Sequence, residues 1–95
     1  MIDIRVQPGR RVDISGHAMF AAKGQDIVCA GVSALFCTLS MADGIGSAET
    51  DGTMCAMVCK PAAGEILRLF CKGFENIAKQ YPTYVRYKVV PIELE

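Results

Sequence analysis

Alternating apolar and polar residues open the chain. Positions 2, 4 and 6 are isoleucine or valine and are separated by charged residues, which is the period of a strand with one buried and one solvated face. Pro8 and Gly9 then supply a turn, and the alternation resumes with apolar residues at Val12 and Ile14. The pattern therefore predicts a β-hairpin over residues 2–15.

Further along the chain, the apolar spacing lengthens to that of helices in two windows. The expected elements after the hairpin are helices over residues 26–41 and 63–80 and strands over 53–60 and 84–90. The glycine- and acid-rich segment 42–52 lies between them as a long connector, either mobile or formed from a frayed helix end followed by a strand. The order β-β-α-β-α-β predicts an α+β domain spanning residues 1–95, with one mostly antiparallel sheet and two helices packed on one face.

Composition excludes some function classes. The 10 basic and 10 acidic residues cancel, so no basic excess favours direct binding of nucleic acid. A neutral surface on a chain that is 52% apolar favours self-association, and we expect a homodimer.

The cysteine content and the first residues bear on the compartment. The charged, alternating start of the chain resembles neither a signal peptide nor a membrane span. The five cysteines are an odd number scattered over the predicted helices and strands, which favours free thiols in a reducing environment. We therefore expect a cytoplasmic protein without a membrane segment.

The sole histidine of the chain and one of its cysteines stand at the two ends of a short loop. His17 follows the second predicted strand and Cys29 falls in the first turn of the first predicted helix, with Gly16 and Gly24 as the points where the loop can bend. Asp26 is placed to cap that helix, and orienting the imidazole is its other possible role. If the loop folds back, an imidazole faces a thiol at a helix N-terminus, which is the pairing of a cysteine nucleophile.

The chemistry of such a pair requires a thiolate. A free thiol has a pKa of about 8.5, and helix-terminal amides, the helix dipole and a neighbouring imidazolium all lower it. His17 would take the thiol proton and return it to the leaving amine, and unpaired amides near Cys29 would donate to the oxyanion. Ser33, one turn after Cys29, is placed to hydrogen-bond near the sulfur or simply to pack there.

Three other interpretations use the same residues. A lone histidine is often a surface residue, and a cysteine in an apolar helix is often part of the core. A metal site built from His17, Cys29, Cys55 and Cys59 is disfavoured, because the last two lie about 13 Å apart along a strand. A redox pair of Cys29 and Cys37 is separated by two helical turns, about 12 Å, and cannot form a disulfide without unwinding. We expect neither a metal nor a cofactor.

At these positions the chain resembles the ribosomal-processing cysteine proteases of the Prp family. The matching pattern is Gly16-His17-Ala18, then Gly24-Gln25-Asp26-Ile27-Val28-Cys29-Ala30, then Val32-Ser33-Ala34-Leu35. The resemblance implies a catalytic pair of His17 and Cys29, supported by Gly16, Asp26 and Ser33, in a homodimer.

The resemblance also implies a substrate. Members of this family remove a short N-terminal extension from large-subunit ribosomal protein L-twenty-seven, cleaving after an aromatic residue in an apolar motif. A loop that orders on substrate would here be residues 19–23, with Met19 and Phe20 free to cover the peptide and Gly24 at its end. Gly31 replaces a usual alanine, which leaves room for a substrate backbone. The alternative is a ribosome-associated module that binds the same peptide without cutting it.

Overall fold

The structure of the protein is a computed structural model, which describes residues 1–22 and 25–90; the predicted loop residue Gly24 lies outside this part of the chain. The elements are β1 (Ile2–Gln7), β2 (Arg11–Gly16), α1 (Ile27–Ser40), β3 (Ile45–Thr50), β4 (Thr53–Val58), a short 3₁₀ turn (Pro61–Ala63), α2 (Gly64–Gln80) and β5 (Val85–Val89). Over these two ranges, no helix has both the length and the apolar character needed to cross a membrane.

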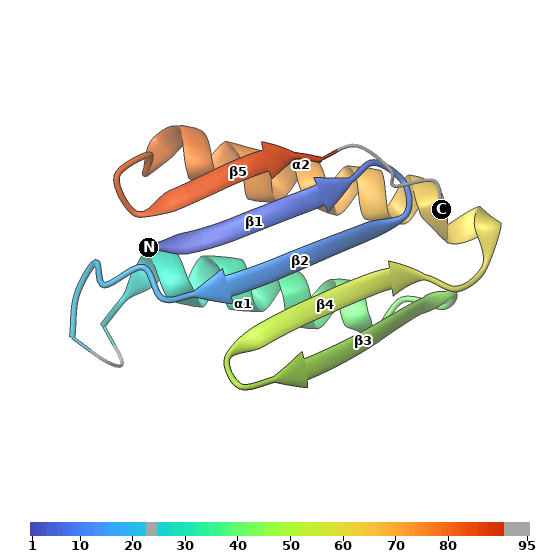
Figure 1. Ribbon diagram of the computed structural model, residues 1–95, viewed down its shortest axis with the longest axis horizontal. Coiled ribbons are helices and arrows are strands. Elements are labelled where there is room, and N and C mark those ends of the chain that lie inside the picture. Colours follow the sequence, from blue (N-terminus) through green and yellow to red (C-terminus); the bar gives the residue numbers. More distant parts are fainter. Residues whose placement is uncertain (23–24, 91–95) are drawn as a thin grey trace.

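One five-stranded sheet carries both helices on the same face (Figure 1). Its strand order is β3-β4-β2-β1-β5, and every neighbouring pair is antiparallel except β1 with β5, which run parallel. The predicted α+β fold, with a mostly antiparallel sheet and two helices packed on it, is thus confirmed. The turn between β3 and β4 lies at the same end of the sheet as the loop that follows β2 (Figure 1).

The sheet has five strands instead of the expected four, because β3 occupies most of the predicted connector. It pairs with β4 from Ile45 opposite Val58 to Thr50 opposite Thr53. Ile45 is buried, whereas residues 47–50 are exposed, so β3 carries almost no apolar pattern. An edge strand with one pairing partner is held chiefly by backbone hydrogen bonds, and for this reason the periodicity of its side chains does not reveal it.

The helices meet at two glycines. A Cβ at Gly31 of α1 would lie 3.4 Å from Cδ1 of Ile77, and a Cβ at Gly73 of α2 would lie 3.1 Å from Cδ1 of Leu35. The expectation that Gly31 leaves room for a substrate is therefore wrong, because this residue faces α2. Beneath the helices, the alternating apolar residues of β1 and β2 form the centre of the core, as the hairpin pattern predicted.

Candidate active site

The first turn of α1 is built on one carboxylate. Asp26 is the N-cap, and its Oδ1 accepts hydrogen bonds from the amides of Val28 at 3.1 Å and Cys29 at 2.9 Å. The bond from the Cys29 amide is the largest of the causes that lower the pKa of Asp26. Of the two roles considered for this residue, capping the helix is therefore the one that the structure shows, and it places Cys29 in the first helical turn.

A backbone amide outside the helix points at the sulfur of Cys29. The N–H of Ala18 donates to Sγ across a distance of 3.2 Å, and Cys29 is half-buried. Such a donor stabilises a thiolate more than a thiol, because the charged sulfur is the stronger acceptor. Sequence reasoning missed this contact, since an alanine carries no side-chain signal and the loop geometry decides where its amide points.

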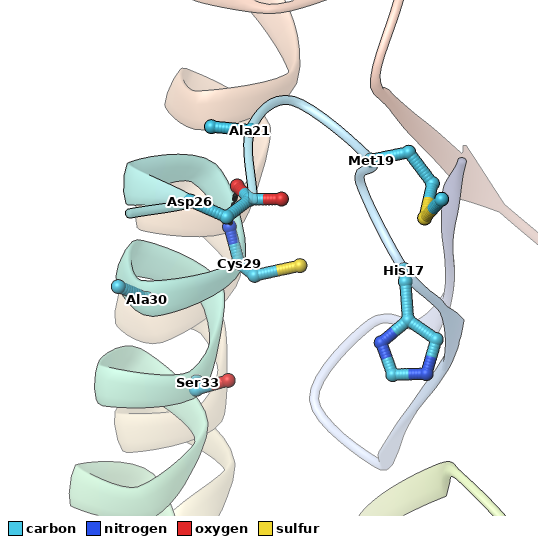
Figure 2. Close-up of a pocket in the computed structure, with 7 residues that line it drawn as sticks. All are labelled: His17, Met19, Ala21, Asp26, Cys29, Ala30 and Ser33. Carbon is cyan, nitrogen blue, oxygen red and sulfur yellow. Dashed lines mark hydrogen bonds between the residues drawn. The ribbon is translucent and has the colours of Figure 1, made fainter. Parts of the chain in front are cut away.

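The chain turns sharply where β2 ends. Gly16 has φ +84°, and a Cβ at this position would collide with the carbonyl oxygen of Met1. His17 follows and is exposed; in Figure 2 its imidazole lies across the pocket from α1, while the Cys29 sulfur extends from the helix into the space between them. Within the part of the chain that the structure describes, no hydrogen bond joins the imidazole of His17 to the sulfur of Cys29.

Phe20 holds the loop between His17 and Cys29 against the rest of the protein. Its amide donates to Oδ2 of Asp26 at 3.1 Å, and its ring makes edge-to-face contacts with Tyr81 and Tyr84, at centroid distances of 5.6 and 5.1 Å. Met19, by contrast, has a positive φ of 57° and is 78% exposed. Of the two side chains expected to cover a peptide, one is therefore packed against the body of the protein and the other extends into solvent.

Two cavities share the wall formed by His17, Cys29 and Ser33. The larger, of about 530 Å³, is completed by four residues of the loop and the first turns of α1: Met19, Ala21, Asp26 and Ala30 (Figure 2). The smaller, of about 160 Å³, is completed by residues from the sheet, from α1 and from the β3–β4 hairpin: Ile2, Ile14, Gly16, Val32, Glu49, Gly52 and Met54. The structure thus brings the predicted residues Gly16, His17, Asp26, Cys29 and Ser33 together around one cleft.

Comparison with known proteins identifies the family. The model of the family described as cysteine protease Prp matches residues 1–86. The chain belongs to this family of cysteine proteases. The ribosomal processing cysteine protease Prp of Mycoplasma pneumoniae is 32% identical over an alignment of 87 residues, and the match covers 82% of this chain and 85% of that protein.

Solved structures of the Prp family share the fold. The Prp protease from S. aureus with a covalently linked product peptide superposes with a TM-score of 0.77 at 23% identity, covering 94% of this chain and 97% of its own. The same protease with a substrate peptide gives a TM-score of 0.71 at 22% identity and the same coverage. The α+β architecture described above is therefore that of the Prp proteases.

A Prp protease needs donors for the oxyanion, and the first-turn amides of α1 are already engaged. The amides of Val28 and Cys29 donate to the Asp26 carboxylate, and that of Ala30 donates to the Asp26 carbonyl at 3.0 Å. The expectation that these amides are unpaired is thus wrong, because the N-cap side chain satisfies two of them. The amide of Ala18 is a backbone donor that the structure places at the sulfur.

The remaining cysteines of this Prp family member lie away from the cleft. All five are free thiols, and Cys29 alone among them lines the two cavities described. Burial raises the pKa of Cys55, which lies beside the Arg11–Asp13 ion pair on the sheet, and raises that of Cys71 to about 11. Within residues 1–22 and 25–90, no three histidine, cysteine or acidic side chains gather into a metal site.

Proposed function

We propose that this protein removes the N-terminal extension of large-subunit ribosomal protein L-twenty-seven, with Cys29 as the nucleophile and His17 as general base and acid. The observation that carries the proposal is the position of Sγ in the first turn of α1, within 3.2 Å of the Ala18 amide and on a wall shared with His17. The relative from Mycoplasma pneumoniae is named a ribosomal processing protease, and the S. aureus structures hold peptides.

The first half of the reaction forms an acyl-enzyme. His17 takes the proton of the Cys29 thiol, and the thiolate attacks the carbonyl carbon of the scissile bond. As the S–C bond forms, the negative charge moves from sulfur to the carbonyl oxygen, so the Ala18 N–H is released to donate to that oxygen. The tetrahedral intermediate then expels the amine, which receives the proton from His17, and leaves a thioester on Sγ.

The second half restores the enzyme. The imidazole of His17, now neutral, takes a proton from water while the water oxygen attacks the thioester carbonyl. Collapse of this second intermediate releases the carboxylic acid and returns the proton to the sulfur. Because His17 is exposed and makes no hydrogen bond to Sγ here, its approach to the sulfur belongs to the substrate-bound state.

The larger cavity fits the apolar cleavage motif implied by the family. Met19, Ala21 and Ala30 give it apolar walls, and its volume of about 530 Å³ is within the range of peptide and small-molecule sites. Met19 is 78% exposed at its rim, so its side chain is placed to fold over an apolar residue of the substrate. Burial of this methionine against a bound peptide would supply apolar contact that the free protein lacks.

Mass spectrometry of a synthetic peptide carrying the extension tests the proposal. We expect the wild-type protein to cut the peptide at one position and Cys29→Ala to leave it intact. Cys37→Ala is the matched control, because Cys37 is an exposed thiol on the same helix, two turns from Cys29. Loss of cleavage in both variants, or in neither, would contradict the assignment of the nucleophile.

Alkylation separates the role of His17 from that of the nucleophile. We expect iodoacetamide to label Cys29 well below pH 8 in the wild type and more slowly in His17→Ala, because an imidazolium stabilises the thiolate. Cys37, labelled in the same sample, provides an internal reference for an ordinary exposed thiol. Equal labelling of Cys29 in the two proteins would exclude an ion pair between the imidazole and the sulfur.

The alternative function is binding without cleavage. A ribosome-associated module would hold the same peptide in the same apolar cavity. The incubation described above distinguishes the two functions, because a module would co-elute with a peptide of unchanged mass. The hydrogen bond from the Ala18 amide to the Cys29 sulfur favours the protease, since a module that only binds the peptide needs no donor at this sulfur.

We also propose that the protein acts in the cytoplasm as a homodimer. We place the interface at Leu69 and its neighbours on α2, where this large apolar side chain is 66% exposed, with an edge of the sheet as the alternative surface. Light scattering of the purified protein tests this, with Leu69→Lys as the variant that should shift the mass toward that of a monomer. A wild-type mass equal to that of one chain would contradict the dimer.

A further inference from the structure

The smaller cavity at the cleft contains one acidic side chain that the reaction above does not use. Glu49 lies near the end of β3, opposite Met54 of β4, and lines the cavity together with His17 and Cys29. Most of the other lining residues are apolar or glycine. Within the described ranges, Glu49 takes part in neither an ion pair nor a side-chain hydrogen bond, unlike Asp26 on the other side of the sulfur.

The position of Cys29 between two cavities determines how a peptide crosses the site. The scissile carbonyl must lie at Sγ, which belongs to the wall of both cavities. An extended peptide leaves that point in two directions, so residues on opposite sides of the scissile bond enter different cavities. One cavity is large and apolar with Met19 at its rim, whereas the other is small, about 160 Å³, and carries the Glu49 carboxylate.

We propose that the smaller cavity is a substrate subsite that selects a basic residue, with Glu49 as its specificity-determining side chain. The inference rests on the proposed peptidase function and adds a charge requirement on one side of the cleaved bond. The apolar stem of a lysine or arginine lies in the cavity against Met54, which is partly exposed, and its charged end meets the exposed carboxylate of Glu49. A glutamate at the same peptide position is repelled.

A set of model peptides tests this inference. Each of the three positions on either side of the scissile bond is occupied in turn by Lys, Gln or Glu, and kcat/KM is measured for each peptide. We expect kcat/KM to be about fivefold higher with Lys than with Gln at one position, on one side of the bond only. A factor of about five is the upper range for an exposed ion pair. Glu49→Gln should abolish this preference, and Glu49→Lys should reverse it in favour of Glu.

Asp51→Asn is the matched control. Asp51 lies two residues from Glu49 in the β3–β4 turn, has a positive φ of 46° that asparagine accepts, and does not line the cavity. This variant should keep the wild-type preference for Lys. Loss of the preference in Asp51→Asn to the same degree as in Glu49→Gln would overturn the subsite, since it would show a general effect of negative charge at this end of the protein.

Three further outcomes would contradict the inference. Cleavage of all peptides without a charge preference would refute the subsite and leave the peptidase function standing, whereas cleavage of none would refute the function itself. A uniform fall in kcat for every peptide in Glu49→Gln, with a shifted pH profile, would mean that Glu49 acts on the His17 imidazole. Glu49 would then be a positioning residue, and the specificity role would be wrong.

Discussion

Replacement of Gly16 by alanine tests whether the end of β2 sets the position of His17. Gly16 has φ +84°, and a non-glycine residue in this left-handed region costs roughly 1–2 kcal/mol. The new Cβ would also collide with the carbonyl oxygen of Met1, which belongs to the backbone and not to the end of a flexible side chain. Forcing an atom into occupied space adds about 1–3 kcal/mol. Gly16→Ala should therefore lower the free energy of unfolding by roughly 2–5 kcal/mol.

Gly52→Ala separates the free-energy cost of the collision from the cost of the left-handed backbone conformation. Gly52 has a similar φ of +79°, and a Cβ there would meet nothing within 4 Å. Both variants lose the same glycine entropy in the unfolded chain, so this contribution cancels between them. We expect Gly52→Ala to lower the free energy of unfolding only by the cost of the left-handed conformation, roughly 1–2 kcal/mol. Gly16→Ala should be less stable than Gly52→Ala by about 1–3 kcal/mol. Urea unfolding followed by circular dichroism measures both values.

Gly16→Ala should also reduce the activity of the protein that remains folded. Relief of the collision moves the start of β1 or the residue that follows Gly16, which is His17. A displacement of about 1 Å of a reacting group costs about 100-fold in rate, so we expect kcat/KM for the extension peptide to fall by about that factor. Equal stability of the two alanine variants, or wild-type cleavage by folded Gly16→Ala, would refute this account of the strand end.

Two further predictions concern stability. Gly31→Ala should raise the free energy of unfolding by up to about 1 kcal/mol in urea titrations, because alanine favours the helix and its Cβ makes ordinary contact with α2 at 3.4 Å. The Cβ of Gly73→Ala would crowd Cδ1 of Leu35 at 3.1 Å, so this variant should gain less stability or lose some. Burial raises the pKa of Cys71 to about 11, so the stability that this thiol contributes is fully present below the pKa of a free thiol and is lost as the pH rises toward 11. Unfolding curves across this window should show a fall on the order of 2 kcal/mol that is smaller in Cys71→Ala, and parallel curves for the two proteins would contradict it.

The elements with strong apolar periodicity were predictable from the sequence. The expected helices over 26–41 and 63–80 match α1 and α2 to within one residue at each end, and the expected hairpin over 2–15 matches β1 and β2. These elements bury one face against the core, so their side-chain pattern carries the information. Residues 45–50 bury one side chain at Ile45, and therefore the sequence did not distinguish this edge strand from a connector.

At the site, the side chains were predictable and the backbone contacts were not. The cap at Asp26 follows from residue type and position, and the structure confirms it with two hydrogen bonds to first-turn amides. The amide of Ala18 reaches the sulfur because of the loop path, which depends on the positive φ of Met19 and the packing of Phe20 on two tyrosines. None of these depends on a local pattern of residue types, so sequence reasoning had no signal for them.

The loop path also explains why an aspartate suits the cap of α1. Its two oxygens serve two segments: Oδ1 accepts from the amides of Val28 and Cys29, and Oδ2 accepts from the amide of Phe20. A serine cap offers one oxygen, and an asparagine cap would turn its NH₂ group, a donor, toward the donor of Phe20. Either residue would cap the helix and release the loop. A single carboxylate therefore fixes the helix end that carries Cys29 and the loop that aims the Ala18 amide at its sulfur.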